Sequence, residues 1–275
     1  MLKKLLKYDF KAIFKYWWIA ALTTLLLSVL GGACFGLLNH DRQFSGIVYT
    51  TIVFVLLFVL FSYAAFSLLS SILVFIRYYK NFFTDEGYLT FTLPVRRSQL
   101  LNSKLISSTT ALFVTTVQCI INIGVVLLIA FAKEIFRQDF WEDFSYFCME
   151  IVNNLGIYLW IYILEALLFT VLSIVMSTLF LFCCITVASI ITKKARLITS
   201  IGIYYAASSV VSFVGQILYT FGIPSLSHWL SKLPASYENP MVALIFFGVI
   251  LFLAIFCMLL YTLQYWMLDR KLNLN

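Results

Sequence analysis

The sequence predicts an all-α integral membrane protein with six transmembrane helices, an N-terminal interfacial helix and both termini in the cytoplasm. Hydrophobic residues make up 63% of the 275 positions and charged residues only 11%, whereas ordinary globular domains carry about 25% charged residues. A water-soluble fold cannot bury so much apolar surface. Six apolar stretches also reach the ~20 residues that a helix needs to cross a bilayer, and lysine and arginine concentrate in alternate connectors.

Residues 1–16 are expected to form the interfacial helix. Plotted at about 100° per residue, the lysines gather on one side and the large apolar residues on the other. The lysines are Lys3, Lys4, Lys7, Lys11 and Lys15. Such a helix lies in the membrane interface with its cations towards anionic headgroups. Asp9 falls within the apolar face, where it either reaches water at the helix edge or pairs with an arginine or lysine of a neighbouring cytoplasmic element.

The six spans are predicted at 17–38, 47–76, 105–132, 155–192, 198–220 and 241–268. If the N-terminus is cytoplasmic, fifteen of the 19 lysines and arginines lie in cytoplasmic segments and four lie outside. This bias follows the positive-inside rule, and it explains the net charge of +7 without a nucleic-acid partner. The second and fourth stretches would be about 45 Å and about 57 Å long as helices, against about 30 Å of hydrocarbon. They are expected to project from the bilayer or to bend into separate pieces.

The connector 77–104, RYYKNFFTDEGYLTFTLPVRRSQLLNSK, mixes charge, turn residues and aromatic residues in an otherwise apolar chain. Thr84 can cap a helix, and Asp85 and Glu86 follow where the positive end of the helix dipole favours acids. Pro94 ends that helix, because proline lacks an N–H group and pushes the preceding residue out of the helical region. The pattern predicts a helix of about two turns, whose acidic tip and aromatic flank suit docking into a groove on another protein.

Two outer connectors carry weaker patterns. Residues 133–154 alternate acidic and aromatic positions, which predicts an amphipathic helix on the outer surface. Residues 221–240 hold three of the four prolines, and their apolar positions suggest one short helix that dips back towards the lipid.

Glu165 is the one carboxylate within an apolar stretch, and an acid in that setting is by default a functional hypothesis. It lies 28 residues before Lys193, which corresponds to about 42 Å along a helix. This distance places Glu165 near the outer headgroups. Two interpretations stay open: a structural or interfacial role, and a role in an outward-facing substrate path.

Small residues recur at helical spacing in two spans, and such pairs let helices approach closely in lipid. The pairs are Gly32 with Gly36 in the first span, and Gly202 with Ala206 and Ser208 with Ser212 in the fifth. They either form a seam between two subunits or pack helices within one subunit.

The sequence contains none of the motifs GxxxxGK[ST], GxGxxG, HExxH or GxSxG. The two histidines and six cysteines show no metal-ligand spacing, and the cysteines are expected to be packing residues. We therefore expect no enzymatic activity, no cofactor and no metal in this chain. Energy for any uphill movement would have to come from a partner.

The segments KKLLKYDFKAIFKYW (3–17) and DEGYLTFTLPVRRSQLLNSKL (85–105), together with the six-span core, resemble the permease subunits of bacterial type-2 ATP-binding-cassette (ABC) exporters, especially the compact ones of Firmicutes. The resemblance covers nearly the whole chain, and DEGYLTFTLPV is its most specific part. It implies a multi-pass protein of the bacterial plasma membrane with residues 1–16 as the elbow helix. The ATPase-coupling residues that it implies are Asp85, Glu86, Gly87, Tyr88, Leu89, Thr92, Leu93 and Pro94.

The resemblance also implies partners. Two copies of a separate cytoplasmic ATPase would dock on the first loop, and a second permease subunit, identical or paralogous, would complete the path. The first and fifth spans would lie at the dimer seam, and short re-entrant helices would precede the sixth span. The implied cargo is an amphipathic peptide, an antibiotic or a lipid-like molecule.

Three other classes stay open from the sequence: a secondary transporter or channel, a membrane-embedded enzyme, and a scaffold or sensor subunit. A secondary transporter would normally show paired intramembrane polar residues or an inverted repeat, and neither is evident. The missing catalytic motifs argue against an enzyme, whereas nothing in the sequence excludes a scaffold.

Overall fold

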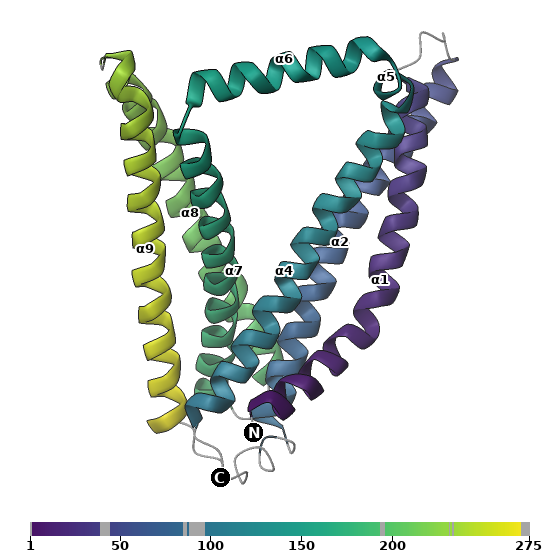
Figure 1. Ribbon diagram of the computed structural model, residues 1–275. Coiled ribbons are helices and arrows are strands. Elements are labelled where there is room, and N and C mark those ends of the chain that lie inside the picture. Colours follow the sequence, from purple (N-terminus) through teal and green to yellow (C-terminus); the bar gives the residue numbers. More distant parts are fainter. Residues whose placement is uncertain are drawn as a thin grey trace. The chain divides into compact units, whose positions relative to one another are not determined.

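A computed structural model describes residues 2–38, 45–84, 87, 97–192, 196–230, 232 and 234–270. These residues are almost entirely helical, and the helices are α1 (Leu2–Leu38), α2 (Gly46–Phe83), α4 (Arg97–Ala130), α5 (Ala132–Ile135), α6 (Gln138–Leu155), α7 (Tyr158–Ile191), α8 (Arg196–Leu230) and α9 (Ala235–Arg270) (Figure 1). Six of them, namely α1, α2, α4, α7, α8 and α9, are long and apolar enough to cross a membrane. The prediction of an all-helical, multi-pass membrane protein is confirmed at this level, and the cytoplasmic location of the termini stays a prediction.

Helix α1 runs without a break through the predicted boundary between residues 16 and 17, and it bends along its course (Figure 1). The sequence offers no proline or glycine there to interrupt it. Its two faces follow the predicted pattern, because Lys7, Lys11 and Lys15 are exposed while Ile13 and Trp17 are buried. The side chains of Lys3 and Lys4 lie outside the described residues. A separate elbow helix therefore stays a prediction.

The two overlong stretches are continuous helices. Helix α2 has 38 residues and α7 has 34, which correspond to about 57 Å and about 51 Å. Of the two expected outcomes, bending into separate pieces is thus wrong for both stretches. Helix α7 begins at Tyr158, and Gly156 adopts a φ of 53° in the turn that separates it from α6. Such a left-handed conformation favours glycine.

The predicted short helix within 221–240 is wrong. Helix α8 instead continues through Pro224 to Leu230, and α9 begins at Ala235. Proline lacks the N–H group that would bond to the carbonyl four residues earlier, yet the helix continues here just beyond the apolar span Leu197–Gly222. Here the Ser225 hydroxyl donates to the carbonyls of Phe221 and Gly222, at 2.9 Å and 2.8 Å.

The chain divides into two compact units, and the helices on either side of the 77–104 connector contribute to both. Unit 1 comprises Met1–Tyr78 and Ile106–Ile151, and unit 2 comprises Tyr79–Leu105 and Val152–Asn275. Most of α2 and α4 therefore belongs to unit 1, whereas the end of α2 and the beginning of α4 belong to unit 2.

In unit 1, polar side chains join α1 to α2 and α4 inside an apolar interface built around Trp17 and Phe66. The hydrogen bonds are Trp17 Nε1 to Thr115 Oγ1 at 2.9 Å, Asn122 Nδ2 to Thr24 Oγ1 at 3.2 Å, and Ser28 Oγ with Tyr63 OH at 2.7 Å. Because lipid offers no polar partner, such bonds favour helix association in a membrane.

Gly32 and Gly36 let α1 approach α4 closely. A Cβ atom at Gly32 would lie 2.8 Å from Ile129 Cβ and 3.0 Å from the Val126 carbonyl oxygen, and one at Gly36 would lie 3.2 Å from the Ala130 carbonyl oxygen. Packing within the subunit, which was one of the two interpretations, therefore accounts for this pair.

In unit 2, α7 packs against both α8 and α9 (Figure 1). Its second half supplies the core, with Leu179, Phe182 and Ile185 almost fully buried. The carboxamide nitrogen of Gln264 on α9 donates to Thr186 Oγ1 on α7 at 2.7 Å.

Candidate functional site

The predicted coupling helix is described at one position. Gly87 has a helical conformation. The other predicted coupling residues lie outside the described residues: Asp85, Glu86, Tyr88, Leu89, Thr92, Leu93 and Pro94. Their role stays a prediction. The two ends of the connector are described, however, because residues 77–83 form the end of α2 and residues 97–104 form the beginning of α4.

Both helical ends of the 77–104 connector, which belong to unit 2, are deeply buried. Phe82 and Phe83 at the end of α2 are 1% and 7% exposed, and Leu100 and Leu101 at the beginning of α4 are 1% and 0% exposed. In addition, the hydroxyl of Tyr261 on α9 donates to Asn102 Oδ1 on α4 at 2.8 Å. The connector therefore emerges from a packed base rather than from two loose helix ends.

Gly87 packs directly on the last turn of α2. Its N–H group donates to the Thr84 carbonyl at 2.7 Å, and a Cβ atom at this position would lie 2.7 Å from the Phe82 carbonyl oxygen. A contact that short forces the backbone to shift, so the conformation requires glycine. The hydroxyl of Thr84, which the sequence predicted as a helix cap, donates back to the Lys80 carbonyl at 2.6 Å.

An ion pair ties the beginning of α1 to the end of α2. The Nε and a terminal guanidinium nitrogen of Arg77 both lie 3.1 Å from Asp9 Oδ1. The Asp9 side chain is 1% exposed and that of Arg77 is 28% exposed. The prediction that Asp9 pairs with an arginine is confirmed, and the alternative that it reaches water is wrong. Arg77 is the first residue of the 77–104 connector, so this pair links α1 to the part of α2 that directly precedes Tyr79.

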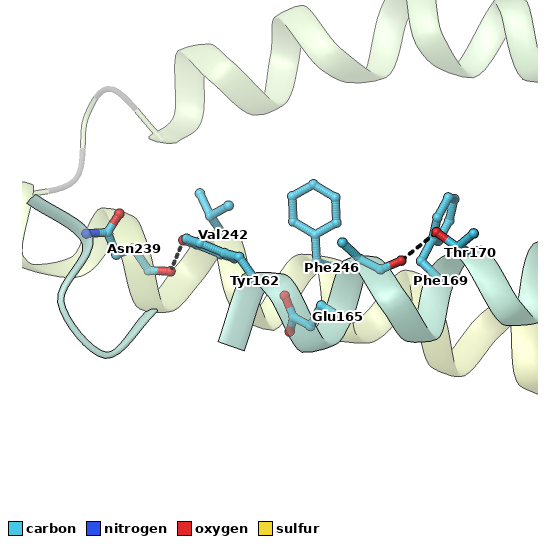
Figure 2. Close-up of a pocket in the computed structure, with 8 residues that line it drawn as sticks. Tyr162, Glu165, Phe169, Thr170, Asn239, Val242 and Phe246 are labelled. Carbon is cyan, nitrogen blue, oxygen red and sulfur yellow. Dashed lines mark hydrogen bonds between the residues drawn. The ribbon is translucent and has the colours of Figure 1, made fainter. Parts of the chain in front are cut away.

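A partly open pocket lies between α7 and α9 near the first turns of both helices (Figure 2). Its volume is about 510 Å³, and it is lined by Tyr162, Glu165, Ala166, Phe169, Thr170, Asn239, Val242 and Phe246. The Tyr162 hydroxyl donates to the Asn239 carbonyl at 3.0 Å and closes one end. The rest of the wall is mostly apolar.

Glu165 is the charged group of this pocket. Its side chain is buried, with 8% of the residue exposed, and its Oε2 atom has no hydrogen-bond partner among the described residues. An unpaired buried carboxylate is costly, so a purely structural role explains it poorly. The sequence singled out Glu165 but not Asn239 or Phe246, because no pattern in α9 indicates which of its residues face α7.

Helix α8 exposes a polar face. The membrane-crossing stretch of α8 has the lowest mean hydropathy of the six candidate spans. Only 6% of its most apolar part is buried inside the subunit, against 44% for α7. Spacings of three and four residues place small and polar side chains on one side, all of them exposed. We call this set the α8 polar face: Gly202, Tyr205, Ser209, Ser212 and Gln216.

The predicted seam residues of the fifth span lie on or beside the α8 polar face. Ala206 is exposed and Ser208 is half-buried, while Gly202 has nothing within 4 Å of its Cβ position. No described residue of the same chain packs on Gly202, in contrast to Gly32. Their role in subunit contact stays a prediction.

No family model, curated protein or solved structure matches this chain.

Proposed function

We propose that this chain is the membrane subunit of an ABC exporter of the bacterial plasma membrane. Two such subunits, identical or paralogous, enclose a path for the cargo. Two copies of a separate ATPase dock on the 77–104 connector from the cytoplasm. Closure of the ATPases on ATP moves the connector and changes the tilt of the spans.

The observation that carries this proposal is the attachment of the connector. The last residues of α2 and the first residues of α4 pack in unit 2, while the remainder of both helices packs in unit 1. A force on the connector therefore reaches unit 2 through direct burial of Phe82 and Leu101, and it reaches unit 1 along two continuous helices. This attachment supports the proposal that a cytoplasmic partner bound to the connector can move both units.

The α8 polar face supports a second membrane subunit. Serine and glutamine side chains that face hydrocarbon lose their hydrogen bonds to water, and polar groups in spans usually face protein or a water-filled cavity. In the described part of the chain, Ser212 and Gln216 remain exposed. A second copy of the subunit would cover part of this face and leave the remainder along the path.

The test is a double substitution at the connector, Tyr88→Ala with Leu89→Ala. We expect it to abolish co-purification of the ATPase and ATP-dependent export, while the permease still reaches the membrane at normal levels. The matched control is Tyr146→Ala with Phe147→Ala on the exposed surface of α6, which should retain the ATPase. An unchanged complex in the connector variant would contradict the proposal.

A second measurement separates the proposal from a secondary transporter. Export should stop when ATP is depleted and should continue when an uncoupler collapses the proton gradient at constant ATP. The opposite pattern would contradict ATP-driven transport.

A further inference from the structure

The pocket between α7 and α9 combines one buried acid with apolar and aromatic walls (Figure 2). Its volume of about 510 Å³ falls in the range of about 300–1,000 Å³ that is usual for small-molecule sites. None of the eight lining residues is a lysine, arginine or histidine. The described residues of the wall therefore offer Glu165 no cation.

The neighbouring polar groups do not satisfy Glu165 either. The Tyr162 hydroxyl, one turn away along α7, gives its proton to the Asn239 carbonyl, and the Thr170 hydroxyl donates to the Ala166 carbonyl at 2.7 Å. An ionised carboxylate only accepts hydrogen bonds, so Oε2 of Glu165 requires a donor from elsewhere. The best complement is a donor that also carries positive charge.

We propose that this pocket binds an organic amine with an apolar body. The ammonium group donates to Glu165, and the body packs against Val242, Phe169 and Phe246. The faces of the two phenylalanine rings add an attraction for the cation when it is desolvated. An alcohol or a carboxylate of the same shape lacks the charge that pairs with Glu165 and should bind far more weakly.

This site belongs to the membrane subunit itself, so its test needs neither ATP nor an ATPase. The probe is tritiated 4-phenylbutylamine, measured by scintillation proximity on the purified chain in nanodiscs of phosphatidylglycerol. Empty nanodiscs correct for partition of the probe into lipid. We expect saturable binding that unlabelled 4-phenylbutylamine displaces and that 4-phenylbutanol and 4-phenylbutanoate do not.

Two substitutions address the two halves of the site. Glu165→Gln should weaken binding by at least about tenfold, which corresponds to about 1.4 kcal/mol, because the amide keeps the shape and loses the charge. Ala166→Trp should also abolish binding by filling the pocket, although Glu165 is intact. The matched control Glu142→Gln removes an exposed acid of α6 and should bind as the unaltered chain does. Size-exclusion profiles establish that each variant is folded.

Phosphatidylethanolamine distinguishes a lipid headgroup from a free amine as the natural ligand. If added phosphatidylethanolamine competes with the probe, the ammonium comes from lipid; if it does not, the ligand is a free amine. The proposal is overturned if binding does not exceed that of empty nanodiscs, if the alcohol competes as well as the amine, or if folded Glu165→Gln binds normally. None of these outcomes bears on whether an ATPase docks on the connector.

Discussion

Two buried carboxylates, Asp9 in unit 1 and Glu165 in unit 2, differ in the partners that they have. In unit 1, Asp9 is buried against Arg77, and Asn122 donates to Thr24. In unit 2, the carboxylate of Glu165 is nearly as buried, yet its Oε2 atom has no partner among the described residues. A satisfied polar contact holds helices together, whereas an unsatisfied one lowers stability unless a ligand completes it. The Asp9 contact therefore stabilises the packing of α1 on α2, whereas the Glu165 carboxylate is open to a ligand.

Of the substitutions considered, the largest loss of stability should come from breaking the Asp9–Arg77 ion pair in unit 1. Arg77→Met removes the guanidinium that lies 3.1 Å from the buried Asp9 carboxylate, and we expect a loss of about 3 kcal/mol in unfolding free energy. Unfolding in mixed micelles with increasing dodecyl sulfate measures this loss. The double variant Asp9→Asn with Arg77→Met should recover part of this loss, because the buried side chain at position 9 then carries no charge.

A second ion pair of the chain supplies the control for Arg77→Met. Arg137 and Asp139 are also linked, at 3.2 Å, but their side chains are 70% and 77% exposed. Arg137→Met should therefore cost at most about 1 kcal/mol. Equal losses of unfolding free energy in Arg77→Met and Arg137→Met would show that the burial of Asp9 does not determine how much its ion pair contributes to stability.

The glycines of α1 and α8 should respond differently to the same change. Gly32→Leu drives a side chain into Ile129 on α4, and we expect it to cost about 1–3 kcal/mol in stability. Gly202→Leu meets nothing within 4 Å in its own chain and should leave the subunit folded. If α8 lies at a seam between subunits, Gly202→Leu should instead shift the complex towards monomers in mass photometry. A dimer that tolerates Gly202→Leu would remove α8 from the seam.

Removal of one polar side chain should lower the unfolding free energy at Asn122 in unit 1 and raise it at Glu165 in unit 2. Asn122→Leu deletes an interhelical hydrogen bond and should cost about 1 kcal/mol. Glu165→Leu removes an unsatisfied carboxylate and should raise stability by about 1 kcal/mol in the absence of ligand. The same mixed-micelle unfolding measures both. If Glu165→Leu destabilises as Asn122→Leu does, the contrast between the units is wrong.

The sequence predicted the class and the approximate spans, because a long apolar run has few alternatives in lipid. It failed where tertiary packing decides: the sequence did not indicate that Leu100 and Leu101 are buried, or that α8 continues past Pro224. The sequence also could not predict which helices contact one another. The pattern found Gly32 as a close-packing residue, but only the structure assigns its contact to α4.

For the candidate site, the sequence likewise predicted the important residues but not their contacts. An acid in an apolar run singled out Glu165, and an acid on an apolar face singled out Asp9. The partners of both could not be predicted, since Arg77 lies 68 residues from Asp9 along the chain, and Phe246 approaches Glu165 only through the packing of α9 on α7.

The central claim is that an ATPase works this chain through the connector between α2 and α4. Its most direct test places a photocrosslinking amino acid at Tyr88, and separately at Tyr146 on α6, in the native cell. We expect irradiation at position 88 to capture a polypeptide that carries a GxxxxGK[ST] motif, and position 146 to capture none. Crosslinks from position 146 to that polypeptide, or none from position 88 at comparable expression, would contradict the claim.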